Sequence, residues 1–326
     1  MKRKTRLIIL LICVVLFLVV VPYIVLYSVG YRVDFENQKI VATGGIYVRV
    51  FPTGVDVSID NGAIDTTGYF YSSVFVQNLL PGVHHVSITK EEYYNYQKNL
   101  LVEENEVTKL ENVTLFKKDI GFQALPDIPA TATTPLQTAT AQFTAMSTNP
   151  ADVFTLKNNT IFQKTAALIK NVAAYNVDGN SLLWLGTDGG LYRSDMQGQN
   201  TQTLADAPIT SIPLLKTAAT SPDNLKIAYY NGHELWYWLL KVEAPNQKVL
   251  LQTSKSTIKN VYWVNNDYLI FSDSDNIIIS EIDVRGNINT ITLTTAVKPQ
   301  LFFDQQDKKL YIFTQNTLVV SDRLLP

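Results

Sequence analysis

The sequence has one cysteine and three histidines in 326 residues, which limits the chemistry that its side chains can assemble. Cys13 lies within an apolar run, so the chain can form neither an internal disulfide nor a cysteine-based metal site. His84 and His85 are neighbours in an alternating segment and would point to opposite faces of a strand, where they cannot share one metal ion. His233 lies in a polar turn. We therefore expect no metal-binding residues.

Motifs of the common catalysts are also missing. The chain has no Gly-x-Ser-x-Gly elbow, phosphate-binding glycine loop, His-Glu-x-x-His helix or paired cysteines. Ser256-x-x-Lys259 and Ser274-Asp275-Asn276 match two elements of penicillin-recognising enzymes, but no Lys-Thr-Gly follows, and no helical period presents the serine. Asp273 and Asp275 lack the spaced ligands and glycine of a calcium-binding loop. The sequence predicts no catalytic residues and no cofactor-binding residues.

The chain has no excess of positive charge that would indicate a nucleic-acid partner. It carries 27 basic and 29 acidic residues, and four of the basic residues fall within the first six positions. The remainder, with 23 basic against 29 acidic residues, is mildly acidic. Such a body fits neither a nucleic-acid binder nor a polybasic protein of the membrane surface.

The strongest positive signal is a long apolar run near the N-terminus. Residues 7–31 contain no charge, and Leu7–Leu26 is aliphatic apart from a few residues such as Pro22 and Tyr23. Twenty helical residues span about 30 Å, the thickness of a bilayer hydrocarbon core. We expect a cytoplasmic stub at 1–6 and a transmembrane anchor at 7–29 that contacts the lipid bilayer through Leu7–Leu26. The basic stub predicts a single-pass protein of the inner membrane, with its N-terminus cytoplasmic and its C-terminal domains extracytoplasmic.

A cleaved signal peptide is the alternative interpretation of this run. The small residues Ser28 and Gly30 resemble a cleavage site. A signal peptide has an apolar core of about 7–15 residues, shorter than the run in this chain. The length therefore favours an uncleaved signal-anchor.

Beyond the anchor, the apolar residues change to a period of two. Val55, Val57 and Ile59 alternate with polar residues, and a similar alternation fills residues 46–51 and 83–89. Turn signals separate these segments, at Pro52-Thr53-Gly54 and Leu80-Pro81-Gly82. We expect a juxtamembrane hairpin at 30–43 and a small β-sandwich at 44–116.

Residues 44–116 resemble a PEGA domain, a β-sandwich named for a turn between its first two strands. That turn is Pro52-Thr53-Gly54-Val55 here, and the later Leu80-Pro81-Gly82 turn and Glu92-Tyr93-Tyr94 segment follow. Thr66-Thr67-Gly68-Tyr69 departs from the Gly-x-Thr-Pro element that is common in the family. Residues 30–45 are similar to the hairpin of bacterial PEGA proteins with a membrane anchor. The resemblance implies a cell-envelope setting and an accessory or binding role.

A change of composition follows, and it indicates a linker at 117–151. Residues 130–150 contain seven threonines, five alanines and two prolines, without any charged residue. Such a segment has little large apolar surface to bury and is typical of an extended chain. In the alternative, Thr138–Met146 adds an edge strand to a neighbouring domain.

Residues 152–326 contain an internal repeat. Four apolar doublets recur at spacings of 44, 42 and 41 residues, and each precedes a short polar turn and a second apolar segment; they are Leu183-Trp184, Ile227-Ala228, Leu269-Ile270 and Leu310-Tyr311. Short strands repeating every 42 residues or so are typical of β-propeller blades, here about four. Ser221-Pro222-Asp223-Asn224 in the second repeat resembles the blade motif of TolB-like, WD-type propellers. We expect residues 153–163 to supply the outermost strand of the last repeat; an open structure, or one completed by a second copy, is the alternative.

These features predict an all-β protein with one N-terminal transmembrane helix, in which a PEGA-like β-sandwich precedes a propeller-like repeat domain. The function that fits is a membrane-anchored extracytoplasmic scaffold or binding module, whose partner is an envelope protein or a cell-surface polysaccharide. The alternative is an extracytoplasmic enzyme with its site in the propeller channel. The sequence predicts no cofactor and does not indicate an oligomeric state.

Overall fold

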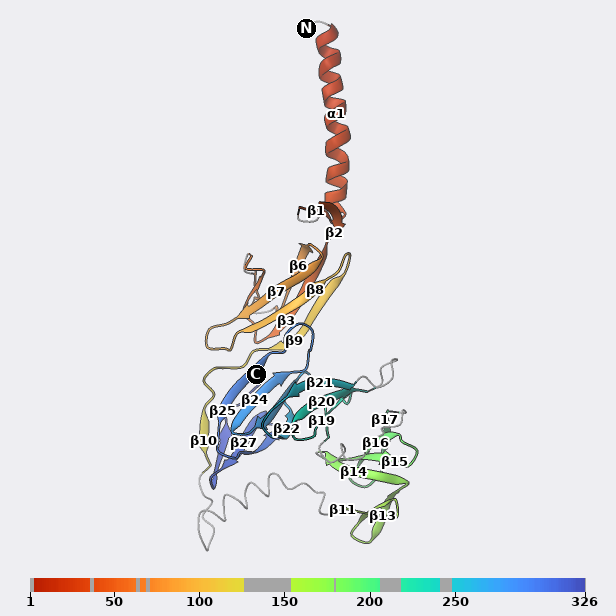
Figure 1. Cartoon of the computed structure of the whole chain (residues 1–326), viewed down its shortest axis with the longest axis vertical. Helices are drawn as coiled ribbons and strands as arrows, with labels where there is room; N and C mark the ends of the chain where they lie inside the picture. The colour runs from red at the N-terminus through yellow and green to blue at the C-terminus, as the bar shows by residue number, and fades with distance from the viewer. Residues whose placement is uncertain are drawn as a thin grey trace. The chain divides into compact units, whose positions relative to one another are not determined.

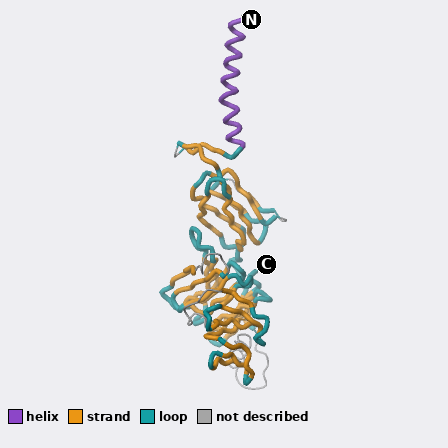
Figure 2. The backbone as a smooth tube through the Cα atoms, turned by 90° about the vertical axis from the view of Figure 1, so that its right-hand side faces the viewer, coloured by secondary structure: helices purple, strands orange, loops and turns teal. Residues whose placement is uncertain are grey.

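The computed structural model describes residues 3–35, 38–62, 65–68, 71–125, 154–178, 180–205, 218–240 and 248–325. Its elements are one helix and many short strands (Figures 1 and 2), which confirms a mostly-β protein with one N-terminal apolar helix. The chain divides into two compact units, residues 1–115 with Arg285–Asn287 and residues 116–284 with 288–326. Of the linker expected at 117–151, the part from 126 onward, including Thr138–Met146, lies outside the described residues.

The helix α1 spans Arg3–Ser28 and contains Pro22. Its side chains from Leu7 onward are mostly well exposed, and within the described chain nothing covers the segment Leu7–Ser28. A helix that is apolar all round and uncovered needs an apolar surrounding. The length and composition of this segment fit a membrane anchor or a signal sequence.

The first unit contains a hairpin and two larger sheets. The hairpin pairs β1 (Tyr31–Asp34) with β2 (Lys39–Ala42). A three-stranded sheet has the order β6-β3-β9, and a four-stranded sheet has the order β5-β4-β7-β8. These strands are β3 (Gly44–Phe51), β4 (Asp56–Ile59), β5 (Asp65–Thr66), β6 (Ser73–Leu79), β7 (Gly82–Thr89), β8 (Tyr96–Val102) and β9 (Val107–Thr114).

The two sheets share one apolar core, which makes the first unit a β-sandwich. Strand β3 shows why, since Ile46, Val48 and Val50 are fully buried and alternate with more exposed residues. The same core receives alternate side chains of β4 and β7 from the other sheet, such as Val57 and Ile88. Alternation with a period of two gives each strand one buried face, as the sequence predicts.

The second unit contains five sheets within the described residues. The first is three-stranded, with the order β11-β12-β13. Three four-stranded antiparallel sheets follow in chain order, and the fifth has the order β10-β28-β27-β26. The strands are β10 (Phe122–Ala124), β11 (Phe154–Lys157), β12 (Thr160–Gln163), β13 (Ala166–Lys170), β14 (Val172–Asp178), β15 (Ser181–Gly186), β16 (Leu191–Asp195), β17 (Gln202–Ala205), β18 (Ala219–Thr220), β19 (Lys226–Tyr230), β20 (Glu234–Leu239), β21 (Lys248–Thr253), β22 (Ile258–Trp263), β23 (Tyr268–Asp273), β24 (Asn276–Glu281), β25 (Thr290–Thr295), β26 (Gln300–Asp304), β27 (Lys309–Thr314) and β28 (Thr317–Ser321).

Each repeat of the sequence forms one of the four-stranded sheets, so the propeller-like repeat is confirmed. The four doublets lie in β15, β19, β23 and β27, the second strands of successive sheets. The polar segments between the second and third strands form tight turns, and Gly232 takes a positive φ of 100° in one of them. Cores form between successive sheets. Leu235 of β20 and Phe271 of β23 belong to one such cluster.

The expected source of the last outer strand is wrong. In the described part of that segment, 154–163, the strands do not pair with the last repeat; Phe154–Lys157 and Thr160–Gln163 pair with each other. Asn158 and Asn159 both adopt positive φ and close this hairpin locally, which costs less chain entropy than pairing across the domain. The outer strand is β10, which pairs with β28 and lies inside the segment expected as linker. Closing an edge in this way removes a row of unpaired backbone groups.

The β10–β28 ladder is testable by proline substitution at Gln123. This residue pairs with Val320, between backbone bonds from Leu125 to Leu318 and from Asp322 to Gly121. Gln123→Pro removes a backbone donor from the ladder, so we expect hydrogen exchange at the amides of β28 to accelerate about tenfold, equivalent to ~1.4 kcal/mol. Gln123→Ala is the matched control. Unchanged exchange in the proline variant would show that β10 does not hold this edge.

Candidate functional site

Hydrogen bonds link successive sheets of the second unit at the repeat period. Asn176 donates its amide to Ala218 O (2.9 Å), and the Trp263 indole donates to Ala219 O (2.7 Å). The bonded residues are 42 and 44 positions apart. The Gln305 amide repeats the pattern by donating to Trp263 O, across 42 positions. The four four-stranded sheets are therefore tied in succession by bonds about one repeat long.

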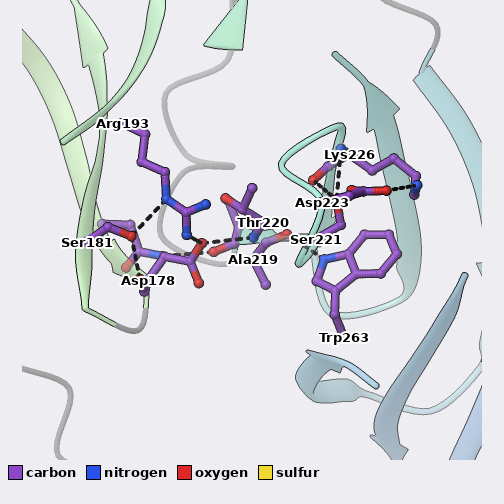
Figure 3. A network of polar contacts seen from close by, with 11 residues as sticks. Asp178, Ser181, Arg193, Ala219, Thr220, Ser221, Asp223, Lys226 and Trp263 are labelled. Atoms are coloured by element: carbon purple, nitrogen blue, oxygen red, sulfur yellow. Dashed lines mark hydrogen bonds and ion pairs between the residues drawn. The ribbon is translucent and has the colours of Figure 1, made fainter. Parts of the chain in front are cut away.

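An ion pair strengthens the junction between the sheets of β14–β17 and β18–β21. The Asp178 carboxylate accepts hydrogen bonds from Arg193 (3.3 Å) and from the backbone N–H of Thr220 in the next sheet (3.1 Å). Arg193 also donates to Ser181 Oγ (2.8 Å), which fixes the guanidinium (Figure 3). Both charged side chains are about four-fifths buried, with 19% and 22% of their surface exposed. Because Asp178 binds both Arg193 of its own sheet and Thr220 of the next, this pair helps to hold the two sheets together.

The second repeat's blade motif has a structural role as well. Asp223 accepts hydrogen bonds from Ser221 Oγ and from Lys226 Nζ (2.9 Å) (Figure 3). Its backbone N–H donates to Asn266 of the next sheet (3.0 Å). Burial alone would raise the pKa of Asp223, but the donors around the carboxylate outweigh burial and lower it. Among the described residues no such set of donors surrounds the carboxylate of Asp267, and burial raises its pKa.

A polar cleft of about 580 Å³ lies where the sheet of β22–β25 meets the start of β26. This volume falls in the range of small-molecule sites, which are commonly lined by apolar side chains. Here the lining is almost entirely polar. It consists of Thr257, Lys259, Asn260, Ser272, Ser274, Asp275, Lys298, Pro299 and Gln300.

A β-bulge shapes one wall of this cleft. The pairing of β22 with β23 shifts register between Lys259 and Tyr262, and Asn260 takes a positive φ of 53°. The bulge turns the Asn260 amide so that it donates to Ser272 Oγ (3.2 Å) and to Pro299 O (3.3 Å). One side chain thereby joins both sheets that border the cleft.

The cleft carries a net positive charge, from two lysines against one aspartate. The ammonium groups of Lys259 and Lys298 make no hydrogen bond or ion pair with any other described residue. Asp275 accepts the backbone N–H of Lys298 (2.9 Å), which orients its carboxylate. The arrangement offers an anionic ligand two free cations beside several hydroxyl and amide groups.

The two motif-like segments contribute to the cleft but form no catalytic pair. Lys259, Ser274 and Asp275 line it, whereas Ser256 does not. Ser256 contacts its neighbours through the backbone, donating to Ser254 Oγ (3.0 Å) and accepting from His233 Nδ1 (3.1 Å). No hydrogen bond between Ser256 Oγ and Lys259 occurs in the part of the chain that the structure describes. A nucleophile and its base need such reach.

The other singled-out residues are distributed among structural contacts. His84 contacts Asp60 Oδ2 and Leu80 O (2.7 Å), while His85 contacts Asn99 on the opposite face of β7. Burial would raise the pKa of Asp60, but hydrogen bonds from His84 and from the backbone of His85 lower it. Ser254 Oγ lies within hydrogen-bond distance of both carboxylate oxygens of Asp273 (2.8 and 2.7 Å). Among the described residues, no three His, Cys, Asp or Glu side chains form a metal-binding cluster.

No protein-family model matches the chain, and no curated protein matches it. Among solved structures, the β-propeller domain of Cps50 (Swd1) from Myceliophteria thermophila aligns with 51% of this chain at 12% identity and a TM-score of 0.34. A gluconolactonase from Xanthomonas campestris aligns with 52% at 16% identity and a TM-score of 0.32. The alignments span 60% and 66% of these proteins, less than two thirds of each. The propeller-like assignment depends on the sheets of this chain itself.

The bond between Trp263 and Ala219 predicts a measurable loss of stability. Trp263→Phe keeps most of the buried ring but leaves the Ala219 carbonyl without its indole donor. We expect the second unit to lose about 1–3 kcal/mol of unfolding free energy, measured by denaturant unfolding of the full-length protein.

Trp236→Phe is the matched control, because that indole bonds Glu234 two residues away and joins no second sheet. Equal losses in the two variants would contradict the role that we assign to the bond between sheets.

Proposed function

We propose that this chain is a single-pass membrane protein that holds an extracytoplasmic binding module close to the membrane. The observation that carries the proposal is α1, in which a predominantly apolar segment of 22 residues, Leu7–Ser28, has no covering element within the described chain. A soluble helix buries at least one apolar stripe. Everything described beyond the helix is built from strands and turns, as in a module that acts outside the bilayer.

The charge around the helix supports the orientation. Four basic residues precede Leu7, and the segment 7–31 carries none. Basic flanks are retained on the cytoplasmic side, which directs the β-units to the opposite side of the inner membrane. The resemblance of residues 44–116 to PEGA domains agrees with a cell-envelope location.

Binding, rather than catalysis, is the role that the cleft supports. Its two unpaired lysines and its hydroxyl and amide groups suit a polar, negatively charged ligand. An envelope polymer that bears carboxylate or phosphate groups has this chemistry. The same groups lack a paired nucleophile and base, so we propose a non-enzymatic scaffold that uses no cofactor.

The single cysteine allows a direct test of topology. In a Cys13→Ser background, Lys2→Cys and Asn316→Cys place a thiol before the helix and in the exposed turn between β27 and β28. We expect a membrane-impermeant maleimide to label position 316 on cells with an opened outer layer, and position 2 only after the inner membrane is permeabilised. We also expect the protein to stay with membranes during alkaline carbonate extraction.

Two results would contradict the anchor. Recovery of a mature protein that begins near Tyr31 would show that the apolar run is a cleaved signal. Labelling of position 2 from outside would show the reverse orientation.

Ligand binding is testable by charge reversal in the cleft. Lys259→Glu and Lys298→Glu replace the two free cations, so we expect affinity for polygalacturonate or polyphosphate to fall at least about tenfold and to lose its dependence on salt. The measurement is equilibrium binding to the full-length protein, with neutral dextran as the ligand control.

Lys255→Glu is the matched protein control, because this exposed lysine precedes β22 and does not line the cleft. An equal loss of affinity in this variant would indicate that binding depends on general surface charge and not on the cleft. Turnover of a polymer would favour the enzyme alternative instead, and retention of an envelope protein alone would favour a protein partner.

A further inference from the structure

The juxtamembrane hairpin has two chemically different faces. Residues opposite each other on paired strands lie on the same face, and the pairs Tyr31–Ala42 and Val33–Ile40 alternate with Arg32–Val41 and Asp34–Lys39. One face is therefore apolar and continues to Phe35, two positions beyond Val33. The other face carries most of the charged residues of the two strands.

The end of the apolar face next to the hairpin turn lies uncovered, whereas Ala42 at the other end is buried. Phe35 is 86% exposed, Ile40 60% and Val33 42%. A two-stranded hairpin by itself is marginally stable in water. Exposure of three neighbouring large apolar side chains to water is a further unfavourable contribution. Grouped exposure of this kind marks an interaction surface.

The position of the hairpin follows from its connection to the helix. Only Val29 and Gly30 separate α1 from β1, a reach of about 7 Å. Arg32 secures the junction, because its guanidinium donates to Tyr27 O at the end of the helix (2.8 Å) and lies 3.5 Å from the centre of the Tyr27 ring. A further hydrogen bond, to Asn78 Oδ1 (2.8 Å), ties the same guanidinium to the loop end of β6.

We propose that the apolar face of this hairpin, formed by Val33, Phe35 and Ile40, lies in the lipid interface of the membrane that α1 spans. The inference rests on the proposed anchor. Leu7–Ser28 is about 33 Å long, close to the ~30 Å of a hydrocarbon core, so the hairpin begins where the interface begins. The interface is several ångströms deep on each side and accepts aromatic and aliphatic side chains.

Tyrosines near the end of the helix also indicate that the hairpin lies at the level of the membrane interface. Tyr23 and Tyr27 lie with their ring centres 6.2 Å apart, and Tyr31 follows on the apolar face of the hairpin. Phenol rings favour the boundary between lipid and water. The hairpin thus adds a second membrane contact that limits rotation of the sandwich about the helix.

Nitroxide labels at single cysteines test the orientation. Full-length protein with Cys13→Ser receives Phe35→Cys, Ile40→Cys or Lys39→Cys and is reconstituted in phospholipid nanodiscs. Labels at 35 and 40 should collide with oxygen, which concentrates in lipid, more than with a water-soluble nickel chelate. The label at 39, adjacent to 40 on the opposite face, should show the reverse preference.

Aqueous exposure at all three positions would overturn the proposal. Val15→Cys, within α1, separates this failure from failure of the anchor, because its label stays in lipid if the anchor is correct. Spin–spin broadening between labels at position 35 would identify a second copy as the occupant, and immobilisation without lipid exposure would identify another protein segment. Either result would contradict a lipid contact.

Discussion

The second unit depends on hydrogen bonds that reach one repeat along the chain. Each four-stranded sheet is small, and its buried residues become a core only against the next sheet, as Leu235 does with Phe271. Bonds such as that from Trp263 to Ala219 fix how two such sheets face each other. They satisfy backbone groups that would be costly to bury alone. The repeat period thus sets both the packing and the polar contacts.

The polar cleft is a consequence of the same stacking. Lys259 lies in β22, and Asp275 lies in the turn between β23 and β24 of the same sheet. Lys298 precedes the next sheet, and Gln300 begins it. The Asn260 side chain holds the two walls at a fixed distance through its bonds to Ser272 and Pro299. A ligand in this cleft would contact two repeats at once, so binding would stabilise their junction. The contacts that join the two sheets therefore also shape the cleft.

The sequence predicts what depends on local periodicity and fails where distant segments meet. Alternation in residues 46–50 and the four repeated doublets indicate the sandwich and the sheets, because each pattern is local. The outer strand β10 could not be predicted, because three residues beside a linker carry little periodic signal. The cleft could not be predicted either, because Lys298 belongs to the loop before the next repeat.

Exposed apolar surface is unevenly distributed along the chain, and this connects the helix with the hairpin. Between Leu7 and Ile40 most large apolar side chains are well exposed, whereas later exposed ones are scattered, as Leu250 and Val297 are, or form a small group such as the cross-strand pair of Val83 and Leu101. Single exposed apolar residues are ordinary in a folded protein, but a continuous series is not. One apolar surrounding would cover the whole series, because the hairpin that carries Phe35 begins just after the helix ends. Arg32 would then satisfy the Tyr27 carbonyl near the end of the helix at a depth where water is scarce.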